Sequence, residues 1–268
     1  MEMITPPAMD QQNTIHSQCK ICGGTGWIMD TSGNEPIARP CKCYKQKLRN
    51  NKIRFANIPE TYKNIRLNDY KTDIYKDDMF NKSASAIKNV VVNYLNNIEE
   101  FKESGIGIYL FSQKKGSGKT LLATAIANEM INEKNMVVKF VTGLDIVNEI
   151  KATWDKNNEQ ELNTEYKLMN YLKTTEVLVI DDFGTENFKD WYDDKFYEII
   201  NTRYSNKLIT IYTSNCSIDQ LRYEEQIKNR IKERTYGIHM PEVSIRDFIA
   251  KERKEELRRL SEDVFTNN

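Results

Sequence analysis

The chain has 268 residues, of which 39% are hydrophobic and 29% charged, with 39 basic and 39 acidic side chains. This composition is typical of a globular protein with one sizeable core, and the balanced charge excludes a global electrostatic attraction to nucleic acid or to membranes. The sequence contains no long apolar run and no amino-terminal signal peptide. We therefore expect a cytoplasmic protein without a membrane span.

The amino-terminal region divides into two parts. Residues 1–18 are polar and are predicted to form a disordered tail, and residues 19–56 are predicted to form a small module. That module contains two close pairs of cysteines: Cys19, Cys22, Cys41 and Cys43. Four thiolates match the tetrahedral coordination of Zn²⁺, and Gly23 and Gly24 permit a tight turn after the first pair. The cysteines therefore predict a structural zinc site.

One histidine, the fifth cysteine and a basic run are also considered with this module. His16 is a spare candidate ligand, whereas Cys216 lies far away in the sequence and is expected in the core. Six basic residues and no acidic residue occur between Lys42 and Arg54. Such a run suits contact with nucleic acid, a solvated helix face or an acidic partner.

Strands and helices alternate in residues 57–268, which we expect to form the second domain. The predicted strands are 106–111, 137–141, 177–180 and 208–212. The predicted helices are 81–103, 119–134, two within 144–173, 190–205, those near 217–235, and 245–260. This alternation predicts an α/β fold in which helices flank a parallel sheet.

The turn after the first predicted strand carries a nucleotide-binding motif. Its sequence, SQKKGSGKT, fits the P-loop pattern GxxxxGK[ST] except that Gln113 replaces the first glycine. The residues expected to cradle the phosphates of ATP are Lys114, Lys115, Gly116, Ser117, Gly118, Lys119 and Thr120. Lys119 would reach the β- and γ-phosphates, and Thr120 would bind Mg²⁺ through its hydroxyl. We expect Gln113 to affect the rate of hydrolysis more than binding.

Polar residues follow two later strands. Asp181 and Asp182 come directly after the apolar strand 177–180, and Asn215 follows the strand 208–212. The carboxyl ends of parallel strands form the ligand crevice of such a sheet. We expect Asp181 to hold Mg²⁺, Asp182 to orient or polarise the attacking water, and Asn215 to bond that water or the γ-phosphate.

Taken together, these motifs resemble the DnaC/DnaI-type bacterial helicase loaders, a branch of the AAA+ ATPases. The matching stretches read CKICGGTGWI, ARPCKC, GSGKT with LLATAIANEMI, VLVIDDFGTE, FYEIINTRY, ITIYTSN, NRIKER and SIRD. The resemblance implies that Asn215 is the sensor 1 residue and that Arg246 acts like sensor 2. It also implies that Arg234, with Arg230 as the neighbouring candidate, is an arginine finger for ATP in the next subunit. Glu186 is expected to tune the site.

The resemblance implies ATP-dependent loading of a DnaB-type replicative helicase onto single-stranded DNA during replication initiation. The zinc module would engage the helicase, and the chains would form a homo-oligomer in the ATP state. Thr142 and Lys151 are candidates for contact with DNA. Two alternatives stay open: an IstB-like helper ATPase of transposition, against which the zinc segment argues, and a non-hydrolysing ATP-binding adaptor, which Gln113 suggests.

Overall fold

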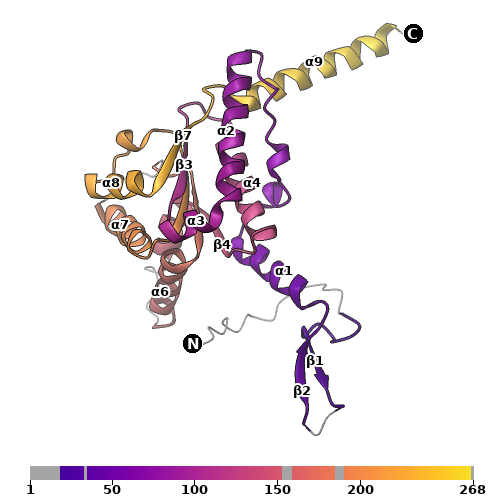
Figure 1. The fold of residues 1–268 in the computed structure, drawn as a ribbon. Coiled ribbons are helices and arrows are strands. Elements are labelled where there is room, and N and C mark those ends of the chain that lie inside the picture. The colour runs from indigo at the N-terminus through magenta and orange to yellow at the C-terminus, as the bar shows by residue number, and fades with distance from the viewer. Residues whose placement is uncertain (1–18, 33–34, 153–158, 185–189, 267–268) are drawn as a thin grey trace. The chain divides into compact units, whose positions relative to one another are not determined.

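A computed structural model describes residues 19–32, 35–152, 159–184 and 190–266. The chain divides into two units between Asn51 and Lys52, and the described residues belong to one or the other (Figure 1). The predicted tail at 1–18, the spare ligand His16 and Glu186 lie outside the described residues. No helix in the described ranges is both long enough and apolar enough to cross a membrane.

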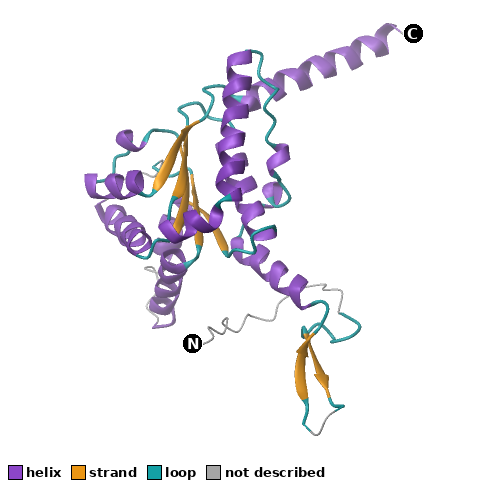
Figure 2. Ribbon diagram, in the orientation of Figure 1, coloured by secondary structure: helices purple, strands orange, loops and turns teal. Residues whose placement is uncertain are grey.

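The first unit is built around a two-stranded hairpin that the sequence did not predict. Strands β1 (Trp27–Asp30) and β2 (Ile37–Pro40) pair in antiparallel register (Figure 2). The basic run then forms helix α1 (Tyr44–Ala56), which continues into the second unit. Lys47 Nζ on α1 donates to the Gly24 carbonyl at 2.8 Å and thereby ties the helix to the turn before the hairpin.

A five-stranded parallel sheet forms the centre of the second unit, which confirms the predicted fold class. Its strands are β3 (Gly107–Phe111), β4 (Val138–Thr142), β5 (Val177–Asp181), β6 (Ile209–Ser214) and β7 (Thr235–His239). They lie in the order β4-β5-β6-β3-β7, and all neighbouring pairs are parallel. The sequence predicted the first four strands and missed β7.

The helices follow the predicted pattern with one exception. They are α2 (Asp78–Asn96), α3 (Ile98–Ser104), α4 (Lys119–Asn132), α5 (Gly143–Ala152), α6 (Glu159–Thr174), α7 (Asp190–Ser205), α8 (Glu225–Glu233) and α9 (Ile245–Thr266). Short 3-10 turns occur at Glu60–Tyr62, Leu67–Asp69 and Ile218–Gln220. The single helix predicted for 81–103 is wrong, because Asn97 leaves helical geometry, with φ −105° and ψ 26°. Its side chain bonds the Asn93 carbonyl and ends α2.

Two hydrophobic clusters, one on each face of the sheet, hold these layers together. Alternate strand residues point to opposite faces, so Val179 joins the cluster under α2 and α4 while Ile180 joins the cluster under α5 to α8. Figure 1 shows α2 and α4 on one side of the sheet and α6, α7 and α8 on the other. Because β5 is buried along its whole length, its last residue, Asp181, is held in a fixed position at the carboxyl end of the strands.

Candidate functional site

A cavity of about 510 Å³ lies at the carboxyl edge of the sheet. It is lined by Tyr62, Asp69, Tyr70, Lys71, Ile74, Lys115, Gly116, Ser117, Gly118, Lys119, Thr120, Leu121, Asp182, Asn215, Ile245, Arg246, Phe248 and Ile249. The cavity therefore brings together the phosphate loop, the start of α9 and two of the three strand-end residues chosen from the sequence, Asp182 and Asn215. Its size falls within the usual range of small-molecule and cofactor pockets.

The phosphate loop has the backbone geometry that its glycines allow. Gly116 has φ 80° and Gly118, which precedes α4, has φ 93°. A Cβ added to Gly116 would lie 2.9 Å from Ser244 Oγ and 3.3 Å from Arg246 Cγ, so this position also lacks space for a side chain. Gln113 has no positive φ, and its replacement of the pattern's first glycine therefore causes no left-handed strain.

Lys119 begins α4 and is only 5% exposed. Its Nζ donates to the Ser112 carbonyl at 3.1 Å, to the Lys114 carbonyl at 3.3 Å and to Ser117 Oγ at 3.4 Å. Burial lowers the pKa of Lys119, whereas nearby acidic groups, of which Asp182 is the foremost, oppose that shift. These neutral acceptors hold the ammonium group within the loop, where a phosphate oxygen can replace them.

Asp181 is 6% exposed and receives two side-chain hydrogen bonds. Thr120 Oγ1 donates to its Oδ1 at 3.0 Å, and Thr213 Oγ1 donates to the same atom at 2.6 Å. Burial raises the pKa of Asp181, and the bonds from Thr213 and Thr120 oppose that shift. A threonine hydroxyl beside a carboxylate next to a phosphate loop is the donor set that Mg²⁺ takes in nucleotide sites, so these residues fit the ion.

Asp182 turns its exposed side chain into the cavity through an unusual backbone conformation. Its φ is 51°, a left-handed value that costs a non-glycine residue about 1 kcal/mol or more. The amide of Asp182 donates to Thr213 Oγ1 at 2.9 Å, and the next amide, of Phe183, donates to the Thr213 carbonyl at 2.8 Å. Thr213 is thus a positioning residue for both acids, and sequence reasoning chose only Asn215 from this strand end.

The three arginines selected from the sequence occupy two different places. Arg246 lines the cavity beside the phosphate loop. Arg234 directly precedes β7, whose first residue pairs with Gly107 at the amino end of β3, whereas the phosphate loop follows the opposite end of that strand. Arg230 and Arg234 therefore lie at the opposite edge of the sheet from the phosphate loop of their own chain.

Aromatic rings hold these two arginines in place. The guanidinium carbons of Arg234 and Arg230 lie 4.8 Å and 5.8 Å from the centre of the Tyr204 ring. Arg234 also donates to the Ser104 carbonyl at 2.6 Å, and Arg230 donates to Tyr197 Oη at 3.2 Å. Cation–π contacts of this kind fix the direction in which an arginine points.

The four cysteines of the first unit form one cluster, with all Sγ atoms within 4.8 Å of one another. Cys19 and Cys41 are 3.6 Å apart, and Cys22 and Cys43 are 3.4 Å apart, so neither pair is a disulfide. Sulfur atoms around a tetrahedral Zn²⁺ with bonds of about 2.3 Å lie about 3.8 Å apart. The spacing and donor set therefore fit Zn²⁺.

Local hydrogen bonds lower the pKa of one cysteine in this cluster and raise that of another. Burial opposes ionisation of Cys22, but bonds from the Gly26 amide and from Cys43 lower the Cys22 pKa to about 6. The bond that Cys43 donates to Cys22, together with burial, raises the Cys43 pKa to about 12. Four thiolates this close repel one another, and a divalent cation removes that repulsion.

Comparison with known proteins agrees with this geometry. A sequence profile described as IstB-like ATP-binding protein matches residues 49–227. The chain belongs to this family. It carries the family's AAA+ domain, and its parallel sheet flanked by helices is the fold of the solved DnaC structure.

Relatives with described roles share this domain. The chain is 35% identical to the replicative helicase loader DnaI of Bacillus subtilis over 147 residues, which are 54% of this chain and 44% of that protein. It is 30% identical to the replicative helicase loader DnaC of Escherichia coli over 124 residues, or 46% of this chain and 48% of that protein. The crystal structure of the DnaC helicase loader matches 68% of this chain and 99% of the solved chain with a TM-score of 0.56 and 25% identity. The chain thus spans about half the length of these two loaders.

Proposed function

We propose that this chain is an ATP-hydrolysing loader of a DnaB-type replicative helicase onto single-stranded DNA during replication initiation. The observation that supports it most is that Lys119 and Thr120 line one cavity, with Asp181 bonded to Thr120, in a chain similar to replicative helicase loaders. The chain spans only about half the length of those relatives, so we propose, and do not infer from the similarity alone, that it shares their activity.

The cavity supports binding and hydrolysis of ATP. The amides of the phosphate loop and the amino end of α4 would receive the phosphates, and Lys119 would neutralise the β- and γ-phosphates. Thr120 and Asp181 would hold Mg²⁺, which supplies positive charge beside the phosphates. Asp182 would orient the attacking water, and Asn215, from the neighbouring strand, would bond the same water or the γ-phosphate.

Hydrolysis would take place between two copies of the chain. Arg230 and Arg234 lie at the far sheet edge from their own phosphate loop, so either would serve ATP only in a neighbouring subunit. Stacking on Tyr204 presents the two guanidinium groups in a defined direction. An arginine supplied in trans stabilises charge on the transferring phosphoryl group. Assembly into a homo-oligomer is therefore part of the proposed mechanism.

The first unit would hold Zn²⁺ and contact the helicase. Its hairpin pairs Trp27 with Pro40 and Met29 with Ala38, so one face of the hairpin is apolar. Trp27 is 46% exposed and Met29 is 58% exposed. Exposed apolar residues on a metal-stabilised hairpin support a protein-binding role for this module. Zn²⁺ would be structural, because four cysteine ligands complete its coordination.

Single-stranded DNA would contact the chain near the carboxyl end of β4 and on α5. Thr142 ends β4 at the same sheet edge as Asp181, with which it pairs. Lys151 is on α5. Its Nζ lies 5.4 Å from the centre of the Tyr192 ring, so the ammonium group makes a cation–π contact. Thr142 and Lys151 are the residues that we propose for contact with single-stranded DNA.

A role as a transposition helper is the second candidate, because the matching profile is described as IstB-like. The two functions differ in their partner. We expect the tagged chain to retain the replicative helicase of its host with ATP and Mg²⁺, and Trp27→Ser with Met29→Ser to weaken that retention. In an unwinding assay on a forked DNA with a single-stranded arm, the helicase should be active only when the chain is present. Retention of a transposase and not of the helicase in any nucleotide state would support the second candidate.

A further inference from the structure

The connection between β7 and α9 contacts the first half of the phosphate loop, from Phe111 to Gly116. The Met240 amide donates to the Phe111 carbonyl at 2.8 Å, just before the loop. The Ile245 amide donates to the Gly116 carbonyl at 3.0 Å, in the middle of the loop. Between these two points, the side chain of Glu242 reaches the loop. We call residues 240–245 the loop clasp.

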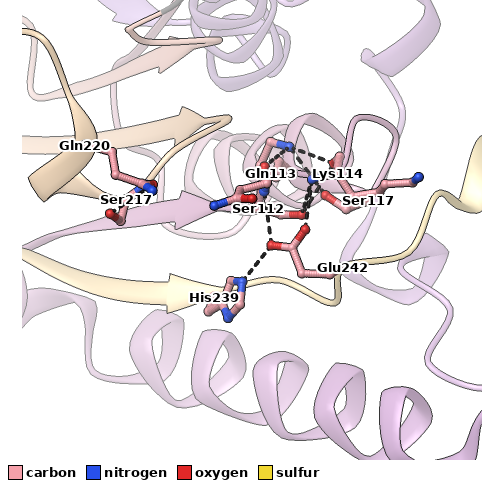
Figure 3. A network of polar contacts seen from close by, with 9 residues as sticks. Ser112, Gln113, Lys114, Ser117, Ser217, Gln220, His239 and Glu242 are labelled. Carbon is pink, nitrogen blue, oxygen red and sulfur yellow. Dashed lines mark hydrogen bonds and ion pairs between the residues drawn. The ribbon is translucent and has the colours of Figure 1, made fainter.

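Glu242 makes the central contact of the loop clasp with both carboxylate oxygens. Oε1 accepts the Gln113 amide at 3.0 Å and Oε2 accepts the Lys114 amide at 2.9 Å. His239 Nε2 lies 2.7 Å from Oε1, and its ring stacks on Phe111 with centres 4.9 Å apart. Figure 3 shows Glu242 between the His239 ring and the backbone of Gln113 and Lys114.

The two amides that donate hydrogen bonds to Glu242 are at the start of the loop. Gln113 and Lys114 come before Gly116, whereas the phosphates would be bound by amides further along the loop and at the start of α4. The Lys114 amide, which the sequence assigned to the phosphate cradle, donates to Glu242 instead. The carboxylate thus holds the loop from outside and leaves the phosphate cradle open. Hydrogen bonds from amides to a carboxylate are stronger than bonds between neutral groups, so a single side chain suffices to fix the start of the loop.

We propose that Glu242 is a positioning residue that fixes the phosphate loop in its nucleotide-binding shape and joins it to the start of α9. This inference rests on the proposed binding of ATP. Arg246 follows the loop clasp by one residue and lines the same cavity. The loop and Arg246 therefore act as one preformed unit, and ATP binding needs no separate ordering of the loop.

The test uses three substitutions of Glu242 in the full chain. Glu242→Ala removes both contacts, Glu242→Gln keeps the shape but loses the charge, and Glu242→Asp keeps the charge but is too short to reach both amides. Asp247→Asn is the matched control: within the described residues, no hydrogen bond joins the Asp247 side chain to the phosphate loop. Calorimetric titration with ATP and Mg²⁺ measures the dissociation constant of each variant.

We expect the dissociation constant to rise about tenfold in Glu242→Ala, which corresponds to about 1.4 kcal/mol. Glu242→Asp and Glu242→Gln should weaken binding to a smaller degree, while turnover at saturating ATP stays within about twofold of the wild type. Amide hydrogen exchange should accelerate at Gln113 and Lys114 without a change in the thermal unfolding midpoint. His239→Phe keeps the ring stack but loses its bond to Glu242, and it should give an intermediate effect.

The possible outcomes separate the inference from the proposed function. A wild-type chain that does not bind ATP would overturn the proposed function itself. If the wild type binds and all three Glu242 variants bind equally well, the positioning role is wrong. If Glu242→Asp binds like the wild type while Glu242→Gln does not, the carboxylate acts through its charge on Lys119 and not by holding the loop, which also overturns the inference.

Discussion

Replacement of Thr213 by valine tests how the two acidic residues of the site are held. Thr213 is fully buried, and its hydroxyl donates to Asp181 and accepts the Asp182 amide. Valine has nearly the same shape but no hydroxyl group. Thr213→Val therefore removes both hydrogen bonds without creating a cavity, whereas Thr213→Ser keeps the hydroxyl and loses one methyl group.

The expected loss of stability follows from those two bonds. A hydrogen bond to a charged group contributes about 1.5–3 kcal/mol, and a buried amide left without a partner costs about 1–3 kcal/mol. Because the bonds share one oxygen, their losses are not additive. We expect the free energy of unfolding to fall by about 2–4 kcal/mol in Thr213→Val and by about 1 kcal/mol in Thr213→Ser.

The pH dependence of this loss has a definite sign. Burial raises the pKa of Asp181, and the bond from Thr213 opposes that shift. Removal of the bond raises the pKa further, so the folded state favours the protonated carboxyl even more. An acid with a raised pKa in the folded state loses stability as the pH rises through that value. The difference between Thr213→Val and the wild type should therefore be larger at pH 8 than at pH 5.

Urea unfolding of nucleotide-free protein, followed by far-UV circular dichroism, measures these differences. The affinity for Mg²⁺ with ATP should fall in Thr213→Val as well, since the ionised Asp181 is the form that binds a cation. Equal stability of the valine and serine variants, or a larger effect at pH 5 than at pH 8, would refute the reasoning.

Three further predictions follow from the proposed roles. Asp182→Asn should bind ATP like the wild type but hydrolyse it about a hundredfold more slowly in a phosphate-release assay; normal turnover would exclude Asp182 from catalysis. Purified, reduced protein should contain about one Zn²⁺ per chain by elemental analysis, and Cys19→Ser with Cys22→Ser should lose the metal while ATP binding survives. Arg234→Ala should retain ATP binding and lose turnover, and mixing it with Lys119→Ala should restore activity; failure of mixing at concentrations where the wild type is active would contradict a finger in trans.

The features that the sequence predicted well are those encoded in short, contiguous stretches. The strand 177–180 is apolar throughout, and SQKKGSGKT joins a strand to a helix, so both could be placed without knowledge of any distant contact. The cysteine pairs likewise predicted the cluster, because two cysteines separated by only one or two residues can bind the same metal ion. The roles assigned to Asp182, Asn215 and the arginines stay predictions.

The features that the sequence missed depend on contacts between distant residues. Strand β7 contains Gly237 and is largely exposed at the sheet edge, so it lacks the apolar run that marks a buried strand. Glu242 lies 129 residues from Gln113, and nothing in the local sequence links the two. Thr213 belonged to a recognised strand end, but its role appears only when β5 and β6 are side by side.

Titration of the purified chain with ATP in the presence of Mg²⁺ tests the central claim most directly. Lys119 is the side-chain cation of the phosphate loop assigned to the β- and γ-phosphates, and its ammonium group is held within the loop by neutral acceptors. We predict saturable binding of one ATP per chain by the wild type and at least a hundredfold weaker binding by Lys119→Ala, equivalent to about 2.7 kcal/mol or more. Equal affinity of the two proteins for ATP would contradict the assignment of this cavity as the nucleotide site.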